Sequence, residues 1–504
     1  MSGNEALTPY DMLVVGGGVN GAGIARDAAG RGLSVLLVEQ DDLAAHTSSA
    51  STKLIHGGLR YLEYGEFRLV RESLIERERL WGMAPHIIWP LRFVLPQTAS
   101  PRAGWMVRAG LFLYDHLGGR RKLPATETIR LALSPLGEGL ADRGGKGFVY
   151  SDCWVEDSRL VVLNAMDAAE HGADVRTRTR LIHARRDGDL WRAAILNEDG
   201  EREVRARMLV NAAGPWVGDI IARAGARSRR TLRLVKGSHI VLPRLYEGDH
   251  AFMLQNPDRR IVFAIPYEGR FTLIGTTEED WRGAPARPHI DEEETAYLLD
   301  TANRYFARRS GRGDVVWAYS GIRPLQDDAA GRASAVTRDY ALDLDTDGAP
   351  MLNVFGGKIT TYRRLAEQAV DLAAPLLPPT VRGAWTAGAV LPGGDLEGGD
   401  FDGFVERLKA ERPGLPAPLL RRLARAYGAR ARDLLGGAQT MDELGERVEG
   451  DLTRAEIDYL AAREWARTAD DILFRRSKLG LHLSARAAER IEAILQAGRI
   501  KMRP

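Results

Sequence analysis

Cysteine is nearly absent from this sequence, because Cys153 is the only one among 504 residues. A single cysteine excludes an internal disulfide, a dithiol redox pair and a metal site built from thiolates. Long apolar runs are also missing, and no stretch approaches the roughly 18 consecutive residues of a transmembrane helix. The first residues, MSGNEALTPYD, lack the basic and apolar segments of a secretory signal. We therefore expect a cytoplasmic protein without a membrane span.

The sequence also lacks an excess of charge of either sign. The 70 Lys and Arg residues nearly balance the 68 Asp and Glu residues, and no long basic block indicates nucleic-acid binding. A hydrophobic content of 44% and a charged content of 27% are typical of a globular protein. A chain of 504 residues is too long for one compact core, so we expect two or three domains.

Glycine, by contrast, is abundant near the N-terminus, in the stretch MLVVGGGVNGAGIARDAAGRGLSVLLVEQ. Gly16, Gly18 and Gly21 follow an apolar run with the spacing G-x-G-x-x-G, and Glu39 ends the next apolar run. Such glycines permit a tight turn and bring a pyrophosphate close to a helix N-terminus, while the acid accepts hydrogen bonds from ribose hydroxyls. The stretch predicts dinucleotide binding and leaves NAD and FAD open.

Two later stretches also join a strand to glycines: MLVNAAGPWV at 208–217 and MLNVFGGKITTYRRLAEQAV at 351–370. Taken singly, each is an ordinary strand-to-helix turn. Backbone N–H groups at a helix start near Thr360 would suit the pyrimidine carbonyl of a flavin and the negative charge on its reduced ring. Because a nicotinamide domain usually completes its site within one contiguous part of the chain, this late return favours FAD.

Strand patterns dominate the middle of the chain. The runs 260–265 and 270–274 flank Glu268-Gly269 and predict a β-hairpin. We therefore expect a mixed or antiparallel sheet in this region.

Helical patterns dominate the last quarter of the chain. Proline and glycine cluster from about Pro375, and beyond them Leu420, Leu423 and Tyr427 share one helical face. This region is therefore predicted to form a helical domain of its own.

Several longer motifs resemble the FAD-dependent, membrane-associated glycerol-3-phosphate dehydrogenases of aerobic respiration: TSSASTKLIHGGLRYLE, APHIIWPLRF, YSDCWVEDSRL, VKGSHIV, YSGIRPL, TRDY, FGGKITTYRRLAE and EWARTADDILFRRSKLG. The resemblance implies an α/β fold with a Rossmann-like FAD-binding domain of the glutathione-reductase or amino-acid-oxidase type, a sheet-containing substrate cap and a C-terminal helical domain. The implied boundaries are 10–90, 145–215 and 322–375 for the discontinuous FAD-binding domain, 91–144 and 216–321 for the cap, and 376–504 for the helical domain.

The same resemblance implies a reaction. It is the oxidation of sn-glycerol 3-phosphate to dihydroxyacetone phosphate by hydride transfer to FAD, with the electrons passed to a membrane quinone. It also implies a peripheral position at the inner face of the cytoplasmic membrane, and it leaves room for a homodimer. Two alternatives stay open: a glycerol-3-phosphate oxidase that uses oxygen, and an amine or amino-acid oxidase of the same fold.

Recognition of a substrate phosphate needs fixed cations, and arginine offers a planar fork of donors. Arg60, Arg323, Arg338 and Lys358 lie beside glycine, proline or loop turns. The family pattern places these four residues and Tyr61 around the substrate. An amino-acid oxidase must instead hold a carboxylate and a neutral amine, so several cations favour a phosphorylated alcohol.

The reaction also needs a base within hydrogen-bond reach of the substrate hydroxyl. His239 in KGSHIV is the candidate by chemistry, although a lone histidine at a strand start is often a core residue. Arg323 and Lys358 are assigned to the same substrate oxygen, because their positive charge favours a developing alkoxide. These three residues are the predicted catalytic group.

In the family, the stretch around His56 runs along the pyrophosphate and the isoalloxazine of FAD. Serines and the N–H groups of a glycine turn suit phosphate oxygens and ring nitrogens. No metal is predicted. The predicted FAD-binding residues are Gly16, Gly18, Asn20, Gly21, Glu39, Ser48, Ser49, Lys53, His56, Gly57, Gly58, Ala213, Gly214, Gly357, Lys358, Ile359 and Thr360.

Residues 86–122 give a separate indication of membrane contact. Trp89, Trp105 and Phe112 are mixed there with aliphatic residues, as in an interfacial anchor, and a buried cap helix with a basic outer side is the alternative. Six cations accompany the single acid Asp115: Arg92, Arg102, Arg108, Arg120, Arg121 and Lys122.

Overall fold

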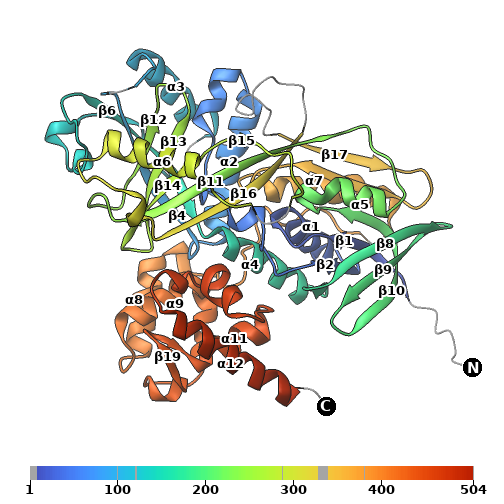
Figure 1. The fold of residues 1–504 in the computed structure, drawn as a ribbon. Coiled ribbons are helices and arrows are strands. Elements are labelled where there is room, and N and C mark those ends of the chain that lie inside the picture. The colour runs from blue at the N-terminus through green and yellow to red at the C-terminus, as the bar shows by residue number, and fades with distance from the viewer. Residues whose placement is uncertain are drawn as a thin grey trace, which may run out of the picture.

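Two β-sheets and a C-terminal lobe make up the molecule, as seen in a computed structural model (Figure 1). The structure describes residues 8–98, 100–119, 122–285, 288–326, 339–379 and 381–502. The first sheet lies at the right in Figure 1, the second at the left, and the C-terminal lobe, orange to red, at the lower left.

The first sheet has the parallel centre expected of a dinucleotide-binding fold. Its order is β17-β18-β10-β1-β2-β7, and β1 pairs in parallel with both β2 and β10. Strand β17 is antiparallel to β18, while β8 and β9 extend from β10 as antiparallel neighbours. The strands are β1 (Tyr10–Val15), β2 (Val35–Val38), β7 (Asp174–Arg176), β8 (Arg180–Asp187), β9 (Leu190–Asn197), β10 (Gly200–Asn211), β17 (Tyr340–Asp345) and β18 (Met351–Gly356).

Both faces of this sheet are covered, which explains why residues 12–15 of β1 are all apolar and buried. Met12 and Val14 pack toward α1 and α7, whereas Leu13 and Val15 pack toward the β8–β9 extension and α5. Helix α1 lies between α4 and α7, and Figure 1 shows it in front of the sheet. The helices are α1 (Val19–Gly30), α4 (Asp157–Glu170), α5 (Val217–Arg223) and α7 (Tyr362–Ala373).

The second sheet is mixed and mostly antiparallel, in the order β15-β11-β14-β13-β12-β4-β6-β3, with β16 on β11 and β5 on β6. One face packs on α6, and the other on α2 and α3. Its strands are β3 (Leu54–Ile55), β4 (Ile88–Pro96), β5 (Glu127–Arg130), β6 (Lys146–Val155), β11 (Leu232–Pro243), β12 (Ala251–Gln255), β13 (Ile261–Tyr267), β14 (Phe271–Gly275), β15 (Glu279–Asp280) and β16 (Trp317–Gln326). The helices are α2 (Phe67–Met83), α3 (Gly104–Leu117) and α6 (Glu292–Tyr305).

The predicted hairpin is confirmed. Strands β13 and β14 pair antiparallel around Glu268 and Gly269, whose φ angles of 46° and 70° are left-handed, as a tight hairpin turn requires. The predicted sheet in the middle of the chain is confirmed with it.

Strand β6 lies in the second sheet, although its residues were predicted to belong to the FAD-binding domain. Its residues fall within 145–215, which was assigned to FAD binding, yet β6 pairs with β3, β4 and β5 of the second sheet. An apolar run indicates a buried strand without naming its partner, because pairing depends on which strands the chain brings alongside.

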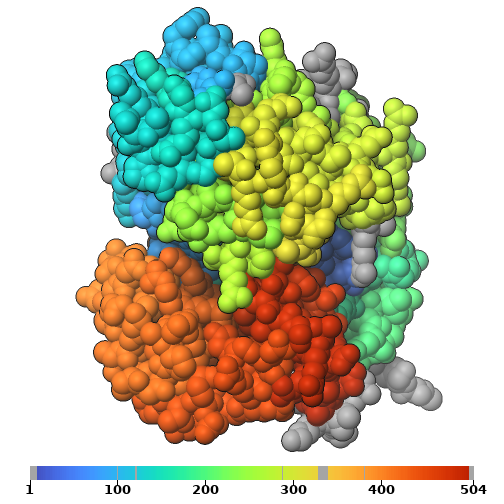
Figure 2. Space-filling model, turned by 60° about the vertical axis from the view of Figure 1, so that its left-hand side comes forward, coloured from blue at the N-terminus to red at the C-terminus, as the bar shows by residue number. Residues whose placement is uncertain are grey.

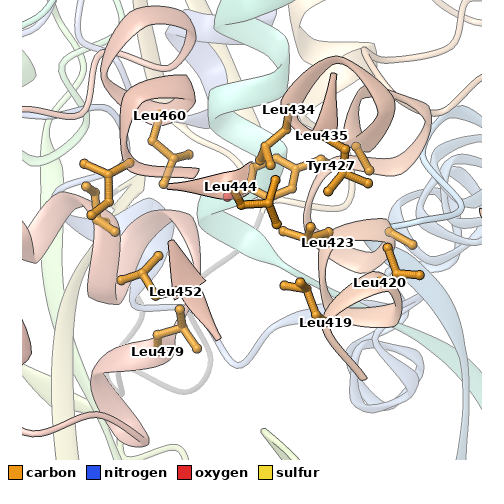
Figure 3. Close-up of a cluster of buried hydrophobic side chains, with 14 of the residues drawn as sticks. Leu419, Leu420, Leu423, Tyr427, Leu434, Leu435, Leu444, Leu452, Leu460 and Leu479 are labelled. Carbon is orange, nitrogen blue, oxygen red and sulfur yellow. The ribbon is translucent and has the colours of Figure 1, made fainter. Parts of the chain in front are cut away.

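The C-terminal lobe has its own core, formed by side chains from all of its helices (Figure 3). Leu420, Leu423 and Tyr427, predicted to share a helical face, are 1% exposed and point into this core. The lobe consists of α8 (Phe401–Glu411), α9 (Ala417–Tyr427), α10 (Ala431–Leu435), α11 (Arg454–Arg463), α12 (Ala485–Met502), the π-helix η12 (Asp471–Arg476) and the strand pair β19 (Arg447–Glu449) and β20 (Leu452–Thr453).

Buried ion pairs connect this lobe to α4 and to the loop after β2. Arg159 of α4 binds Glu464 through both guanidinium nitrogens, with side chains 3% and 0% exposed. Arg476 of η12 donates to both oxygens of Asp42, at 2.7 and 2.8 Å. Figure 2 shows the orange and red lobe seated closely against the rest of the molecule. Because both partners are desolvated, each pair favours one relative position of the two parts.

Replacing Glu464 with Gln should therefore lower the free energy of unfolding by about 3–5 kcal/mol, because Arg159 keeps a buried charge without its counter-ion. The measurement is the urea midpoint of the holoenzyme. Glu203→Gln is the matched control, since Glu203 also binds an arginine through two bonds, with side chains 29% and 41% exposed. The control should lose less than about 1 kcal/mol. Equal losses in the two variants would contradict the role of the junction pair.

Candidate active site

A cavity of about 370 Å³ draws its walls from both sheets, a volume within the range of small-molecule sites. The first sheet contributes the ends of β1, β2, β10 and β18, and the second contributes residues of β12, β13 and β16. The carboxyl ends of the parallel strands therefore open toward the second sheet, where an α/β fold places its ligand.

The glycine stretch after β1 lines the cavity with Gly16, Gly17 and Gly18. Gly16 has a φ of 111°, and a Cβ there would lie 2.6 Å from the carbonyl oxygen of Ala212. A Cβ on Gly21 would lie 1.9 Å from the carbonyl oxygen of Gly16. Only glycine fits at either position. The N-terminus of α1 consequently reaches the cavity, where the N–H of Val19 donates to Ser48 at 3.0 Å and the positive end of the helix dipole suits a pyrophosphate.

Glu39 lies at the end of β2 on the cavity wall. Its carboxylate accepts the N–H groups of Gly17 at 2.6 Å and Asp41 at 2.9 Å. Burial raises the pKa of Glu39, while the two N–H donors favour the charged form. A carboxylate has about four acceptor sites, so these bonds orient it and leave lone pairs for ribose hydroxyls. The residues present fit the adenosine half of FAD.

The turn between β18 and α7 supplies a second part of the wall. Gly356 and Gly357 have φ angles of 75° and 106°, and Asn20 of α1 donates its side-chain N–H to the carbonyl of Gly356 at 3.1 Å. Thr360 accepts the backbone N–H of His56 at 3.2 Å and donates to its carbonyl. Three glycine-bearing stretches that are far apart in the sequence thus meet at one cavity.

The predicted cations reach the cavity from three places: Arg60 from the segment after β3, Arg323 from β16, and Lys358 from the turn after β18. Arg60 and Arg323 flank Glu278, each about 3.5 Å from one of its carboxylate oxygens. The Lys358 ammonium lies 3.8 Å from the centroid of the Tyr61 ring. All of these side chains line the cavity. Arg338, the remaining predicted cation, lies outside the described residues.

His239 occupies a place behind this wall. It is fully buried, its Nε2 lies 3.0 Å from the Thr52 hydroxyl, and its ring stacks on Tyr319. Burial, Arg323 and Lys53 hold the pKa of His239 well below its usual range. Thr52 lines the cavity, whereas His239 does not.

His56, predicted as a cofactor contact, lines the cavity, and so does His46, which lies 2.8 Å from Asp41 beside Glu39. Burial lowers the pKa of His56 to about 3, and the neighbouring charges of Lys358 and Arg77 act in the same direction. Its imidazole is therefore neutral at physiological pH, and the unprotonated ring nitrogen can accept a hydrogen bond.

Four of the predicted FAD contacts support the wall without lining it. Gly21 packs α1 against β1, and Gly57 donates its N–H to Tyr114 at 2.7 Å. Lys53 is fully buried and binds both oxygens of Asp157 at 2.8 Å, with Ser49 giving it a carbonyl.

Several lining residues were not predicted. Thr276, which accepts a hydrogen bond from Arg323 at 2.8 Å, and Glu278 lie in IGTTEED directly after β14. The sequence did contain a signal for these two residues, namely a polar run that directly follows β14, the strand paired with the one that carries His239. Phe263 of β13 and Thr179 carry no comparable signal, because single residues within a strand or loop have no motif.

The fold and the cavity define a FAD-dependent oxidoreductase. Residues 11–363 match the family described as FAD dependent oxidoreductase, and residues 385–499 match the C-terminal domain of alpha-glycerophosphate oxidase. The chain is 54% identical to D-erythritol 1-phosphate dehydrogenase of Brucella abortus, over 94% of this chain and 95% of that protein. It is also 54% identical to glycerol-3-phosphate dehydrogenase of Pseudomonas aeruginosa, over 97% and 95% of the two chains.

A solved structure extends the likeness. The FAD complex of glycerol-3-phosphate dehydrogenase from Bacillus halodurans matches with a TM-score of 0.77 at 26% identity, over 97% of this chain and 94% of that one. The chain belongs to the family of FAD-dependent glycerol-3-phosphate dehydrogenases. The predicted fold class and the choice of FAD over NAD are confirmed.

The neutral, buried state of His239 makes stability depend on pH. Its folded pKa is depressed, so its contribution is present above the unfolded value of about 6.5 and is lost as pH falls below it. At pH 5 the resulting loss in the free energy of unfolding is about 2 kcal/mol. We expect the melting temperature of wild type to fall more steeply between pH 7 and 5 than that of His239→Gln, which keeps a partner for Thr52. Parallel pH profiles would refute this expectation.

Proposed function

We propose that this enzyme oxidises sn-glycerol 3-phosphate to dihydroxyacetone phosphate and reduces FAD. The observation that carries the proposal is the convergence of Arg60, Arg323 and Lys358 on a cavity whose opposite wall suits FAD. Their charge suits a phosphate dianion better than the amino group of an amino acid. Relatives over nearly the whole chain that are named glycerol-3-phosphate dehydrogenase support the same substrate.

D-erythritol 1-phosphate is the second candidate substrate, because the relative named for it is as similar to this chain as the one from P. aeruginosa. Both molecules are phosphorylated polyols with secondary hydroxyls. The same cations would hold the phosphate of either, so the two substrates differ only in the length of the polyol.

In the proposed reaction, bound FAD would supply the acceptor for the hydride of the secondary carbon. Arg60 and Arg323 bind the phosphate, and Lys358 favours negative charge on the reacting oxygen. His56 lines the cavity and takes the hydroxyl proton, because the negative charge of the bound phosphate raises the pKa that burial and the cations lower. His239 orients Thr52 from behind, in place of the direct role first assigned to it.

Glycerol 3-phosphate should bleach the visible absorbance of the flavin when added without oxygen, and glycerol should not, because it lacks the phosphate. Lys358→Met should lower kcat/KM on the order of 100-fold, since a charge beside the developing oxyanion is lost. Lys409→Met is the control, because Lys409 lies on α8 in the C-terminal lobe and pairs with Glu406. D-erythritol 1-phosphate is compared in the same assay.

Bleaching by amino acids and not by either polyol phosphate would overturn the proposal. The acceptor is tested on the same reduced enzyme. Reoxidation by a short-chain quinone under anaerobic conditions is expected to outpace reoxidation by air. Peroxide formed in equal amount to the oxidised substrate would identify an oxidase instead.

A membrane quinone can accept the electrons only if the enzyme lies at the membrane. We therefore also propose a peripheral position at the inner face of the cytoplasmic membrane. Within the described ranges, every helix is too short or too polar to span a bilayer. Helix α3 is instead amphipathic: Trp105 and Phe112 are 74% and 57% exposed, while Leu111 and Tyr114 are buried. Exposed aromatic side chains on one face suit insertion at a membrane surface.

The basic part of this segment supports the proposal less strongly. Arg92 binds Glu127 and Arg102 binds Glu63, so part of the expected positive charge is compensated. Arg120 and Arg121 lie outside the described residues.

Replacing both Trp105 and Phe112 with Ser should reduce sedimentation with anionic liposomes at least about tenfold, because two large apolar side chains no longer leave water on binding. The paired control is Leu372→Ser with Leu376→Ser, which are 40% and 43% exposed at the end of α7. Equal liposome binding by wild type and the α3 variant would exclude α3 as the anchor.

A further inference from the structure

We propose that Tyr114 of α3 is a positioning residue for the turn at 56–58, which brings His56 to the cavity. The inference rests on the proposed function, because that function gives His56 its role. Tyr114 lies outside the cavity lining and acts only through the turn.

The contact is a hydrogen bond between side chain and backbone. The Tyr114 hydroxyl accepts the N–H of Gly57 at 2.7 Å and lies 2.8 Å from each carboxylate oxygen of Asp152, to which it donates. Arg77 donates to Asp152 at 2.6 Å and to the Ser151 carbonyl at 2.9 Å. Tyr114, Asp152 and Arg77 are 3%, 1% and 4% exposed, so water does not compete for these bonds.

The protonation states of Tyr114 and Asp152 determine which group donates each hydrogen bond. Burial and Asp152 raise the pKa of Tyr114 well above its ordinary value, so the phenol stays protonated. Its one proton is given to Asp152, which leaves a lone pair of the phenol oxygen for the N–H of Gly57. Asp152 in turn balances Arg77, whose charge lies close enough to His56 to lower its pKa.

Steric fit holds the turn in the same place. A Cβ on Gly57 would lie 2.7 Å from the Tyr114 hydroxyl and 2.6 Å from Cδ2 of Leu74, so only glycine permits this approach. On its other side the turn is bound by Thr360, through the N–H and the carbonyl of His56. Tyr114 and Thr360 therefore clamp the backbone of His56 and Gly57 from two sides.

Helix α3 thus has two functions on opposite faces. Its exposed face carries Trp105 and Phe112, and its buried face places the Tyr114 hydroxyl on the turn. A small displacement of a reacting group lowers the rate strongly, whereas substrate affinity depends on the cations elsewhere in the cavity. Loss of the hydroxyl should therefore act on the chemical step.

Tyr114→Phe removes only the hydroxyl, and Tyr246→Phe is the matched control. Tyr246 is 5% exposed in the same half of the molecule, donates to backbone carbonyls at 2.8 and 3.0 Å, and does not line the cavity. In anaerobic stopped-flow measurements on holoenzyme, Tyr114→Phe should reduce flavin with glycerol 3-phosphate about tenfold more slowly or worse, with substrate Kd changed less than threefold. Tyr246→Phe should match wild type in both.

Hydrogen exchange provides a readout that needs no substrate. Peptides that contain Gly57 should exchange faster in Tyr114→Phe than in wild type or Tyr246→Phe, because the Gly57 N–H has lost its acceptor. If polyol phosphates did not bleach the wild-type flavin, the proposed function would be wrong. Hydrogen exchange at Gly57 would still test whether Tyr114 positions the turn. Unchanged exchange at Gly57, or flavin reduction at the wild-type rate, in Tyr114→Phe overturns the inference.

Discussion

The contact between Gly16 and the end of β10 is the constraint on which the site depends. Gly16 approaches Ala212 so closely that no side chain fits between them, and Gly21 approaches Gly16 in the same way. This packing brings the N-terminus of α1 to the cavity, and α1 then carries Asn20 to the turn before α7. A dinucleotide site assembled from distant parts of the chain therefore follows from a few positions where backbone touches backbone.

The cations behind the cavity wall are paired with buried acids, and those at the cavity surface are accessible to a ligand. Lys53 is paired with Asp157 and Arg77 with Asp152, both deep behind the wall, so these buried cations are balanced and structural. The cations at the cavity surface, by contrast, stand where a ligand can reach them, with Glu278 between two of them. Burial and the nearby charges of Lys358 and Arg77 disfavour a further positive charge, which keeps His56 neutral.

Local patterns predicted much of this arrangement. The hairpin around Glu268-Gly269 and the buried face of α9 depend on residues that are close in sequence. The three glycine-bearing stretches line one cavity, and FAD was selected because the third lies so late in the chain. Strand β6 was assigned to the FAD-binding segment yet pairs in the second sheet, since an apolar run does not specify its neighbour. Chemistry alone preferred His239, whereas burial separates it from the cavity and leaves His56 there.

The sequence by itself determined which nucleotide binds, because glycines at fixed spacing, a following acid and a late strand-to-helix turn encode backbone geometry locally. It also determined the family and a set of cations suited to phosphate. Only the tertiary structure decided that His56 lines the cavity and His239 does not, which cations meet there, and that the Tyr114 hydroxyl reaches Gly57. These outcomes depend on distances between residues far apart in the chain, and such distances arise from the packing of two sheets and a lobe rather than from any local pattern.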